Sequence, residues 1–298
     1  MTDSALFDPT APLTASGNLR RRQLVSRVAD IGARVSAMIA VAVLAIVVYS
    51  VAQRGGGALS WHFLTQDPPL FGGSSGGIAP AIIGTGLIVT LATVIAMPVG
   101  VLVALYATEY ANRRSERLIR GALDAMQGLP SIVVGVVIFG LMVAGHGETG
   151  LAGSVALAII MLPLIARGSQ EVLLRAPGSL REAAEALGVS HWRTVVGVIL
   201  PSSIGGILTA TILAVARAAG ETAPLLLLTS TVPNSVTLNV FGQPLPNIPV
   251  MIFNLSEGDD PSGFSRAWGA AFVLLAAILL ANVGARVLLA RSGRKLSG

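Results

Sequence analysis

The sequence predicts an all-α integral membrane protein with six transmembrane helices. Of its 298 residues, 53% are hydrophobic and only 12% are charged, and the mean hydropathy of +0.76 is far above that of a soluble domain. Long apolar segments alternate with polar ones, and basic residues gather in alternate polar segments. We therefore expect a disordered cytoplasmic tail (1–34), a six-helix transmembrane domain (35–290) and a basic cytoplasmic tail (291–298).

Six apolar segments are long enough to be these spans when a few flanking residues are included. They are 35–52, 78–106, 129–144, 151–166, the segment from residue 199 onward, and 268–289. The first begins late and is long, which favours a retained anchor over a cleaved signal peptide. Residues 54–77 and 230–266 are expected to be loops, and 107–127 a polar connection.

The basic residues predict the orientation of the chain. Seventeen of the twenty Lys and Arg residues lie in the N-terminal tail, the 107–128 segment, the 167–195 segment and the C-terminal flank. Arg54 and Arg266 lie on the other side, and Arg217 lies inside a span. Because cytoplasmic loops carry an excess of Lys and Arg, both termini and the 167–195 segment are expected in the cytoplasm.

The chain lacks the motifs of an enzyme that works alone. It has no cysteine, and His62, His146 and His191 lie in different segments without metal-ligand spacing. The only lysine, Lys295, follows no glycine-rich P-loop. No basic patch interleaved with aromatics suggests nucleic-acid binding. We expect no catalytic residue, no metal site, no bound cofactor and no nucleic-acid partner.

The polar stretch 179–201 has the pattern of a short amphipathic helix, a glycine turn and a second helix. Its apolar residues recur on one helical face at Leu180, Ala183, Ala184 and Leu187. Ser179 and Glu182 have the spacing of a capping box, and Gly188 stands at the expected C-cap. The simplest alternative is a cytosolic amphipathic hairpin in which Glu182 caps only its own helix.

The same stretch resembles the EAA loop of ABC-importer permeases, with the pattern E-A-A-x3-G-x9-I-x-L-P. The matching residues are Glu182, Ala183, Ala184, Gly188, Leu200 and Pro201, with Val198 at the isoleucine position. The resemblance implies a MetI-like permease fold with a cytoplasmic coupling helix. It also implies a separate ATPase subunit that receives this helix and binds ATP and Mg²⁺.

Arg217 and Glu221 are an ionisable pair inside an apolar span. Their i, i+4 spacing puts them on one helical face. A charge at the bilayer centre costs ~2.5–3.5 kcal/mol, so such groups normally face a cavity or a partner. The segment 199–230 would be about 48 Å long as one helix, against a membrane core of about 30 Å, and Gly220 and Pro224 indicate a break. The alternative is a structural ion pair.

The motif R-A-x-G-E-T-A-P at 217–224 resembles the phosphate-specific (Pst) ABC importer permeases. The I-F-N-L stretch at 252–255 and Ala267-Trp268 are similar to the PstA type, and the likeness covers residues 75–290. It implies a multi-pass subunit of the bacterial inner membrane that works with a second permease, two ATPases and an extracytoplasmic phosphate-binding protein. Arg217 would lie on the phosphate path, with Glu221 and Thr222 beside it.

Alternative functions remain open at this point. The chain could be an ABC importer permease for another solute, such as another oxyanion, or an ion-coupled secondary carrier or channel gated by Arg217 and Glu221. We also hypothesise that Glu221 holds Arg217 and accepts the proton of HPO4²⁻, which sulfate lacks. Glu109, at the inner end of the second span, is interpreted as an interfacial group.

Overall fold

The computed structural model describes residues 18–69, 76–230, 235–258 and 261–296, and the regular secondary structure within these ranges is all helical. The chain divides into two units, Met1–Ala52 and Gln53–Gly298. Five helices are long and apolar enough to cross a membrane, and one bent helix pair makes a sixth if it is counted as a crossing. The predicted all-α class is confirmed.

The first unit contains most of α1 (Asn18–Gly56), a helix of 39 residues. The predicted disordered tail differs from the structure here, because residues 18–34 continue the span as helix. This arginine-rich segment contains no proline, and Arg, Leu, Gln and Ala are good helix formers. Residues 1–17 of the predicted tail lie outside the described residues.

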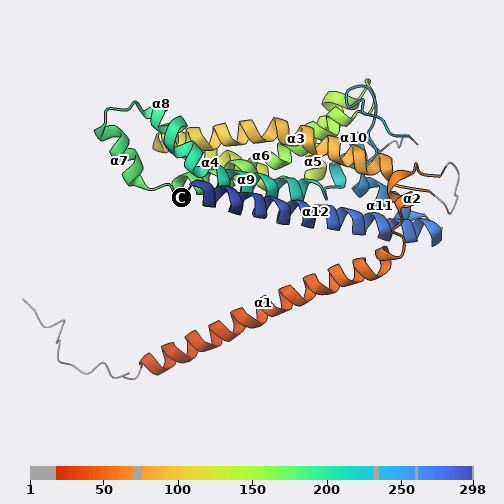
Figure 1. The fold of residues 1–298 in the computed structure, drawn as a ribbon, viewed down its shortest axis with the longest axis horizontal. Coiled ribbons are helices and arrows are strands. Elements are labelled where there is room, and N and C mark those ends of the chain that lie inside the picture. Colours follow the sequence, from red (N-terminus) through yellow and green to blue (C-terminus); the bar gives the residue numbers. More distant parts are fainter. Residues whose placement is uncertain (1–17, 70–75, 231–234, 259–260, 297–298) are drawn as a thin grey trace, which may run out of the picture. The chain divides into compact units, whose positions relative to one another are not determined.

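The core of the second unit is formed by α3 (Ala79–Leu105), α6 (Gly150–Leu174) and α9 (Leu200–Ala218), which run along one another (Figure 1). Small residues and one isoleucine recur every fourth position along α3, and all are buried: Gly84, Ile88, Ala92, Ala96, Gly100 and Ala104. Such a seam lets two helix backbones approach closely. A Cβ on Gly100 would lie 2.9 Å from Ile165 of α6.

The polar connection 107–127 is largely helical. It contains the π-helix η1 (Tyr106–Tyr110) and α4 (Arg113–Gly128), whose N-cap Asn112 accepts hydrogen bonds from two backbone N–H groups. After Pro130 the chain turns by 93° into α5 (Ser131–Ile138) and η2 (Phe139–Val143). These last two segments have 8 and 5 residues and reach only about 20 Å. The predicted third span is therefore shorter than a membrane core.

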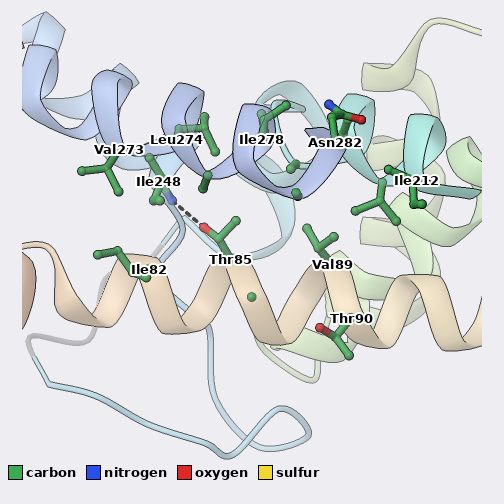
Figure 2. Close-up of a pocket in the computed structure, with 16 residues that line it drawn as sticks. Ile82, Thr85, Val89, Thr90, Ile212, Ile248, Val273, Leu274, Ile278 and Asn282 are labelled. Atoms are coloured by element: carbon green, nitrogen blue, oxygen red, sulfur yellow. Dashed lines mark hydrogen bonds between the residues drawn. The ribbon is translucent and has the colours of Figure 1, made fainter. Parts of the chain in front are cut away.

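The loops at one end of the unit carry α2 (Trp61–Thr65) and α11 (Ile248–Glu257). The backbone N–H of Ile248 donates to Thr85 of α3 over 2.9 Å, which ties α11 to the bundle (Figure 2). The last helix, α12 (Pro261–Leu296), includes residues 291–296 of the predicted C-terminal tail. Figure 2 also shows an apolar cavity of about 330 Å³ between α3 and α12.

Candidate functional site

Arg217 and Glu221 open onto a cavity of about 310 Å³. Its walls come from the turn between α4 and α5, the middle turns of α6 and the end of α9: Met126, Gln127, Leu129, Pro130, Ser131, Val134, Ile159, Ile160 and Leu164. Only Arg217 and Glu221 are charged among the residues lining this cavity. The described residues that line the apolar cavity of Figure 2 include no charged side chain.

The chain breaks between Arg217 and Glu221, as the sequence predicts. α9 ends at Ala218 and α10 (Ala223–Leu228) begins after four residues without regular helix. The N–H of Gly220 donates to the carbonyl of Arg217, and that of Glu221 to Ala218, which tightens the last turn. A Cβ on Gly220 would meet only the Arg217 carbonyl oxygen, at 3.7 Å, so the break does not depend on glycine.

The Arg217–Glu221 pair is loose. The closest nitrogen and carboxylate oxygen are 3.8 Å apart, and the arginine side chain is 61% exposed while that of Glu221 is 18% exposed. A separation of 3.8 Å is too long for a hydrogen bond. The guanidinium therefore keeps its donors available toward the cavity, with one carboxylate close enough to hold its position.

The remaining candidates near the break divide into two groups. Ser131, at the start of α5, lines the cavity. Thr222 precedes α10 and does not line it; its carbonyl accepts a hydrogen bond from Leu226 instead. The structure therefore brings Arg217, Glu221 and Ser131 together and leaves Thr222 outside the cavity wall.

The stretch that resembles the EAA loop forms α7 (Gly178–Ala186), a turn, and α8 (His191–Thr194) at the end of the unit opposite to α2 and α11 (Figure 1). The expected capping box is wrong. The helix begins one residue before Ser179, Pro177 occupies the N-cap, and no side chain caps it. Glu182 and Ala183 are exposed, as is Leu187 at 81%, whereas Ala184 is buried.

Gly188 terminates α7 in a left-handed conformation, with φ of +69°. Its N–H donates to Glu185, and the N–H of Val189 donates to Ala184 over 3.0 Å. These two bonds are those of a Schellman motif, which requires a residue at positive φ. The turn between the two helices is therefore fixed by local backbone geometry.

Replacing Gly188 by Ala should strain this turn by about 1–2 kcal/mol, because side chains carrying a Cβ disfavour the left-handed region. We expect the protection of the α7 amides against hydrogen exchange to fall roughly tenfold in the membrane-embedded protein. The matched control is Gly178→Ala, at the first residue of the same helix, where an added Cβ meets nothing within 4 Å. Equal protection in the two variants would contradict this role of Gly188.

The helix that follows the turn is continuous to Ala218. A π-helical segment, η3 (Val195–Ile199), joins α8 to α9, and Pro201 stands in the first turn of α9. Proline has no N–H to donate to residue 197, and the wider turn accommodates this loss. Leu200 packs beside Ile199 and Ile207 in a small apolar cluster, whereas Pro201 is exposed.

Glu109 ties this segment to the end of α3. Its side chain is only 4% exposed and accepts two hydrogen bonds from Arg181, at 2.7 and 3.3 Å. Arg181 also donates to the carbonyls of Leu173 and Ala176, at the end of α6. The hydrogen bonds from Arg181 to Glu109 raise the pKa of Arg181 above its ordinary value.

A second contact reaches Glu109 from α8. The Nε2 atom of His191 lies 3.1 Å from the backbone oxygen of Glu109, and its ring meets Tyr110 edge-on. Residues from both helices of the EAA-like segment thus converge on one buried carboxylate residue. The interpretation of Glu109 as merely interfacial misses this, because its partners are 72 and 82 positions away in the sequence.

Comparison with known proteins gives the family. Residues 96–298 match the model of the binding-protein-dependent transport system inner membrane component. The chain belongs to this family. It is 32% identical to the phosphate transport system permease protein PstA 1 of Mycobacterium tuberculosis, covering 97% of this chain and 95% of that protein. It is 35% identical to the phosphate transport system permease protein PstA of Yersinia pestis, over 82% of this chain and 83% of that protein. The resemblance to PstA-type permeases is confirmed.

Solved structures of ABC transporters share the fold of this chain. An inward-facing structure of the MetNI methionine ABC transporter superposes with a TM-score of 0.57, at 19% identity, over 72% of this chain and 94% of that one. The structure of a bacterial alginate ABC transporter superposes with a TM-score of 0.59 at 13% identity, over 90% of this chain and 96% of that one. The predicted MetI-like fold is confirmed. Its relatives are transport-system components of the inner membrane.

Proposed function

We propose that this permease imports inorganic phosphate across the bacterial inner membrane as one subunit of an ATP-driven transporter. The observation that carries the proposal is the accessible guanidinium of Arg217 on a cavity beside the middle of α6. Arginine offers a planar set of donors that matches phosphate oxygens, and this distinguishes it from a point charge. PstA permeases are the relatives that support phosphate as the ion.

The proposed assembly contains a second permease, two ATPase subunits and an extracytoplasmic phosphate-binding protein. ATP and Mg²⁺ would be bound by the ATPases, since this chain has no P-loop. The exposed face of α7, with Glu182, Ala183 and Leu187, supports a docking surface for an ATPase. In this arrangement both termini and α7 face the cytoplasm, in accordance with the distribution of basic residues.

The proposed path begins with the phosphate displacing Glu221 from Arg217. The loose 3.8 Å pair favours this exchange, because no hydrogen bond between the two side chains has to be broken. Glu221 is then positioned to accept a hydrogen bond from the protonated oxygen of HPO4²⁻, which offsets part of the repulsion between the carboxylate and the anion. Closing of the ATPases would move α7 and α8, and with them the continuous helix that ends in Arg217.

The proposal is tested by uptake of radiolabelled phosphate in cells whose own copy of the gene is deleted. The wild-type chain should restore uptake at micromolar phosphate, and uptake should stop when cellular ATP is depleted and the membrane potential is kept. Restored uptake that follows the membrane potential instead would favour an ion-coupled carrier. Failure of the wild-type chain to restore phosphate uptake would overturn phosphate as the substrate.

Replacing Glu221 by Gln tests the role of the carboxylate in selectivity. The variant keeps the size of the side chain but replaces one carboxylate oxygen, an acceptor, by an amide group that donates. We expect competition by sulfate to increase about tenfold relative to wild type, since a neutral hydrogen-bonded partner contributes about 1–1.5 kcal/mol of discrimination. The measurement is the sulfate concentration that halves phosphate uptake. An unchanged value would show that Glu221 has only a structural role.

A further inference from the structure

Another arginine, Arg266, lies at the end of the bundle opposite to α7. Arg266, in the second turn of α12, has its Nε and Nη1 atoms buried, and neither finds a hydrogen-bond partner within the described part of the chain. Arg266 as a whole is half-buried, and a partly desolvated guanidinium without a counter-charge is costly, so natural proteins usually pair it. Its environment therefore indicates a missing anionic partner.

The nearby amide of Asn247 is in the same condition. This residue is 1% exposed, and its Oδ1 atom accepts a hydrogen bond from the N–H of Val250 as the N-cap of α11. Its Nδ2 atom is buried and has no partner among the described residues. Because the Oδ1 atom is used by the N-cap, the group left over is the Nδ2 amide, which is a hydrogen-bond donor.

Arg266 and Asn247 both line one cavity of about 140 Å³. A water molecule takes about 30 Å³ of liquid volume, so the space admits a tetrahedral oxyanion. Thr229 also lines the cavity, but its hydroxyl already donates to the carbonyl of Leu245. No Asp or Glu of the described ranges lines it. The free polar groups are donors and one of them is cationic, a combination that selects an anion over a cation or an apolar ligand.

Arg266 also borders a second cavity, of about 360 Å³, between α2 and the start of α12. Ser60, His62, Ser262 and Ser265 contribute to its walls, and again no acidic residue of the described chain does. Arg266 thus borders two cavities, which we call the inner (about 140 Å³) and the outer (about 360 Å³) cavity.

The position of this site relates it to transport. The inner cavity is lined by Ala81, in the first turn of α3, whereas Glu109 follows the last turn of that helix. At 1.5 Å per residue, the two ends of the 27-residue α3 are about 40 Å apart. The site therefore lies at the end of the permease opposite to the segment proposed to meet the ATPases.

We propose that Arg266 and Asn247 form a second phosphate site, which receives the ion from the extracytoplasmic side before it reaches Arg217. This inference rests on the proposed function for the identity of the ion. Arg266 supplies two hydrogen bonds and the balancing charge, and Asn247 supplies a third donor from the neighbouring helix.

The absence of cysteine from the sequence allows a direct test. Asn254 is exposed and lines the inner cavity, so Asn254→Cys places one thiol at the site. In intact cells without the phosphate-binding protein, a membrane-impermeant maleimide should label this cysteine. Millimolar phosphate should slow the labelling relative to chloride at equal ionic strength. The control Phe264→Cys, exposed on α12 and outside both cavity walls, should label at the same rate in either salt.

Arg266→Gln should raise the phosphate concentration that gives half-protection at least tenfold, because it removes charge-assisted hydrogen bonds. Asn247→Asp keeps the capping oxygen and replaces the donor by a negative charge, so protection should be lost. This variant also tests the site if Arg266→Gln fails to reach the membrane. Arg54→Gln alters the other arginine of this flank, which lies over Trp268, and should leave protection unchanged.

Three outcomes would overturn the assignment. One is labelling that phosphate does not affect. Another is protection that Arg266→Gln and Asn247→Asp both retain. The third is protection that appears only after the binding protein is added. The binding protein, and not phosphate bound at Arg266, would then shield the cysteine. Phosphate should still protect the cysteine in Arg217→Gln, because the labelling assay measures binding and does not require transport. The assay therefore tests the Arg266 site independently of the proposed path through Arg217. If the wild-type chain gives no phosphate uptake but phosphate still protects the cysteine, the result contradicts phosphate import and leaves the second site supported.

Discussion

Arg217→Gln should reduce phosphate uptake at least about tenfold, because it removes charge-assisted hydrogen bonds to the ion, which contribute about 1.5–3 kcal/mol. Glutamine retains hydrogen-bonding groups but loses the charge that offsets the transfer of an anion into an apolar bundle. The measurement is the initial rate of radiolabelled phosphate uptake at micromolar phosphate, normalised to the amount of permease in the membrane. Arg217→Lys should fall between the two, since it restores the charge without the planar set of donors.

Two controls accompany this prediction. Arg117→Gln removes an exposed arginine of α4 whose side chain donates only to the carbonyl of Arg113, and uptake should stay at the wild-type level. Glu221→Gln should retain uptake and change selectivity. Wild-type uptake by Arg217→Gln would assign the arginine a structural role.

Glu109→Gln should impair coupling and stability together. The substitution leaves Arg181 without its carboxylate, and breaking a fully buried pair costs about 3–5 kcal/mol. Because the Arg181 side chain is 29% exposed, solvent recovers part of this, and we expect a loss of about 1–3 kcal/mol. Thermal unfolding of the purified permease should shift to lower temperature, and phosphate uptake should fall although Arg217 is intact.

The matched control for Glu109→Gln is Glu116→Gln. Glu116 accepts a hydrogen bond of 2.6 Å from Arg120 on the surface of α4, where both side chains are more than one-third exposed. Exposed i, i+4 pairs contribute about 0.3–0.5 kcal/mol, so this variant should behave like wild type. A double-mutant cycle of Glu109 with Arg181 should give a coupling energy of about 1–3 kcal/mol. Additive effects would show that the two side chains do not act through each other.

The features that sequence could predict are local ones. Apolar length predicts where helices cross the membrane, and Gly188 marks a helix end because its left-handed conformation is a property of one residue. The Arg217–Glu221 pair is recognisable because its partners are one helical turn apart. The break after α9 follows from helix length and from Pro224.

The features that sequence could not predict depend on residues far apart in the chain. Glu109 gains its role from Arg181 and His191 only after α3, α7 and α8 meet. The capping box fails because the helix begins at Gly178, two residues before the start that Ser179 as N-cap would give, so Pro177 is the N-cap instead. The four-residue seam of α3 was readable in principle, as small residues at positions 84, 92, 96, 100 and 104. A hydropathy profile does not reveal this seam, because it does not distinguish small apolar residues such as alanine and glycine from large ones by size.

The unbroken course from His191 to Ala218 has a mechanical consequence. A span of 28 residues joins the turn after α7 to the guanidinium of Arg217 with no loop between them. A displacement applied at His191 is therefore carried along one helix of about 42 Å. The π-helical segment η3 is the place along it where the helix twists most easily. Twisting the helix at η3 would rotate Arg217 around the helix axis, away from Glu221 or toward it. Access of the anion to the guanidinium would then depend on the rotation of one helix.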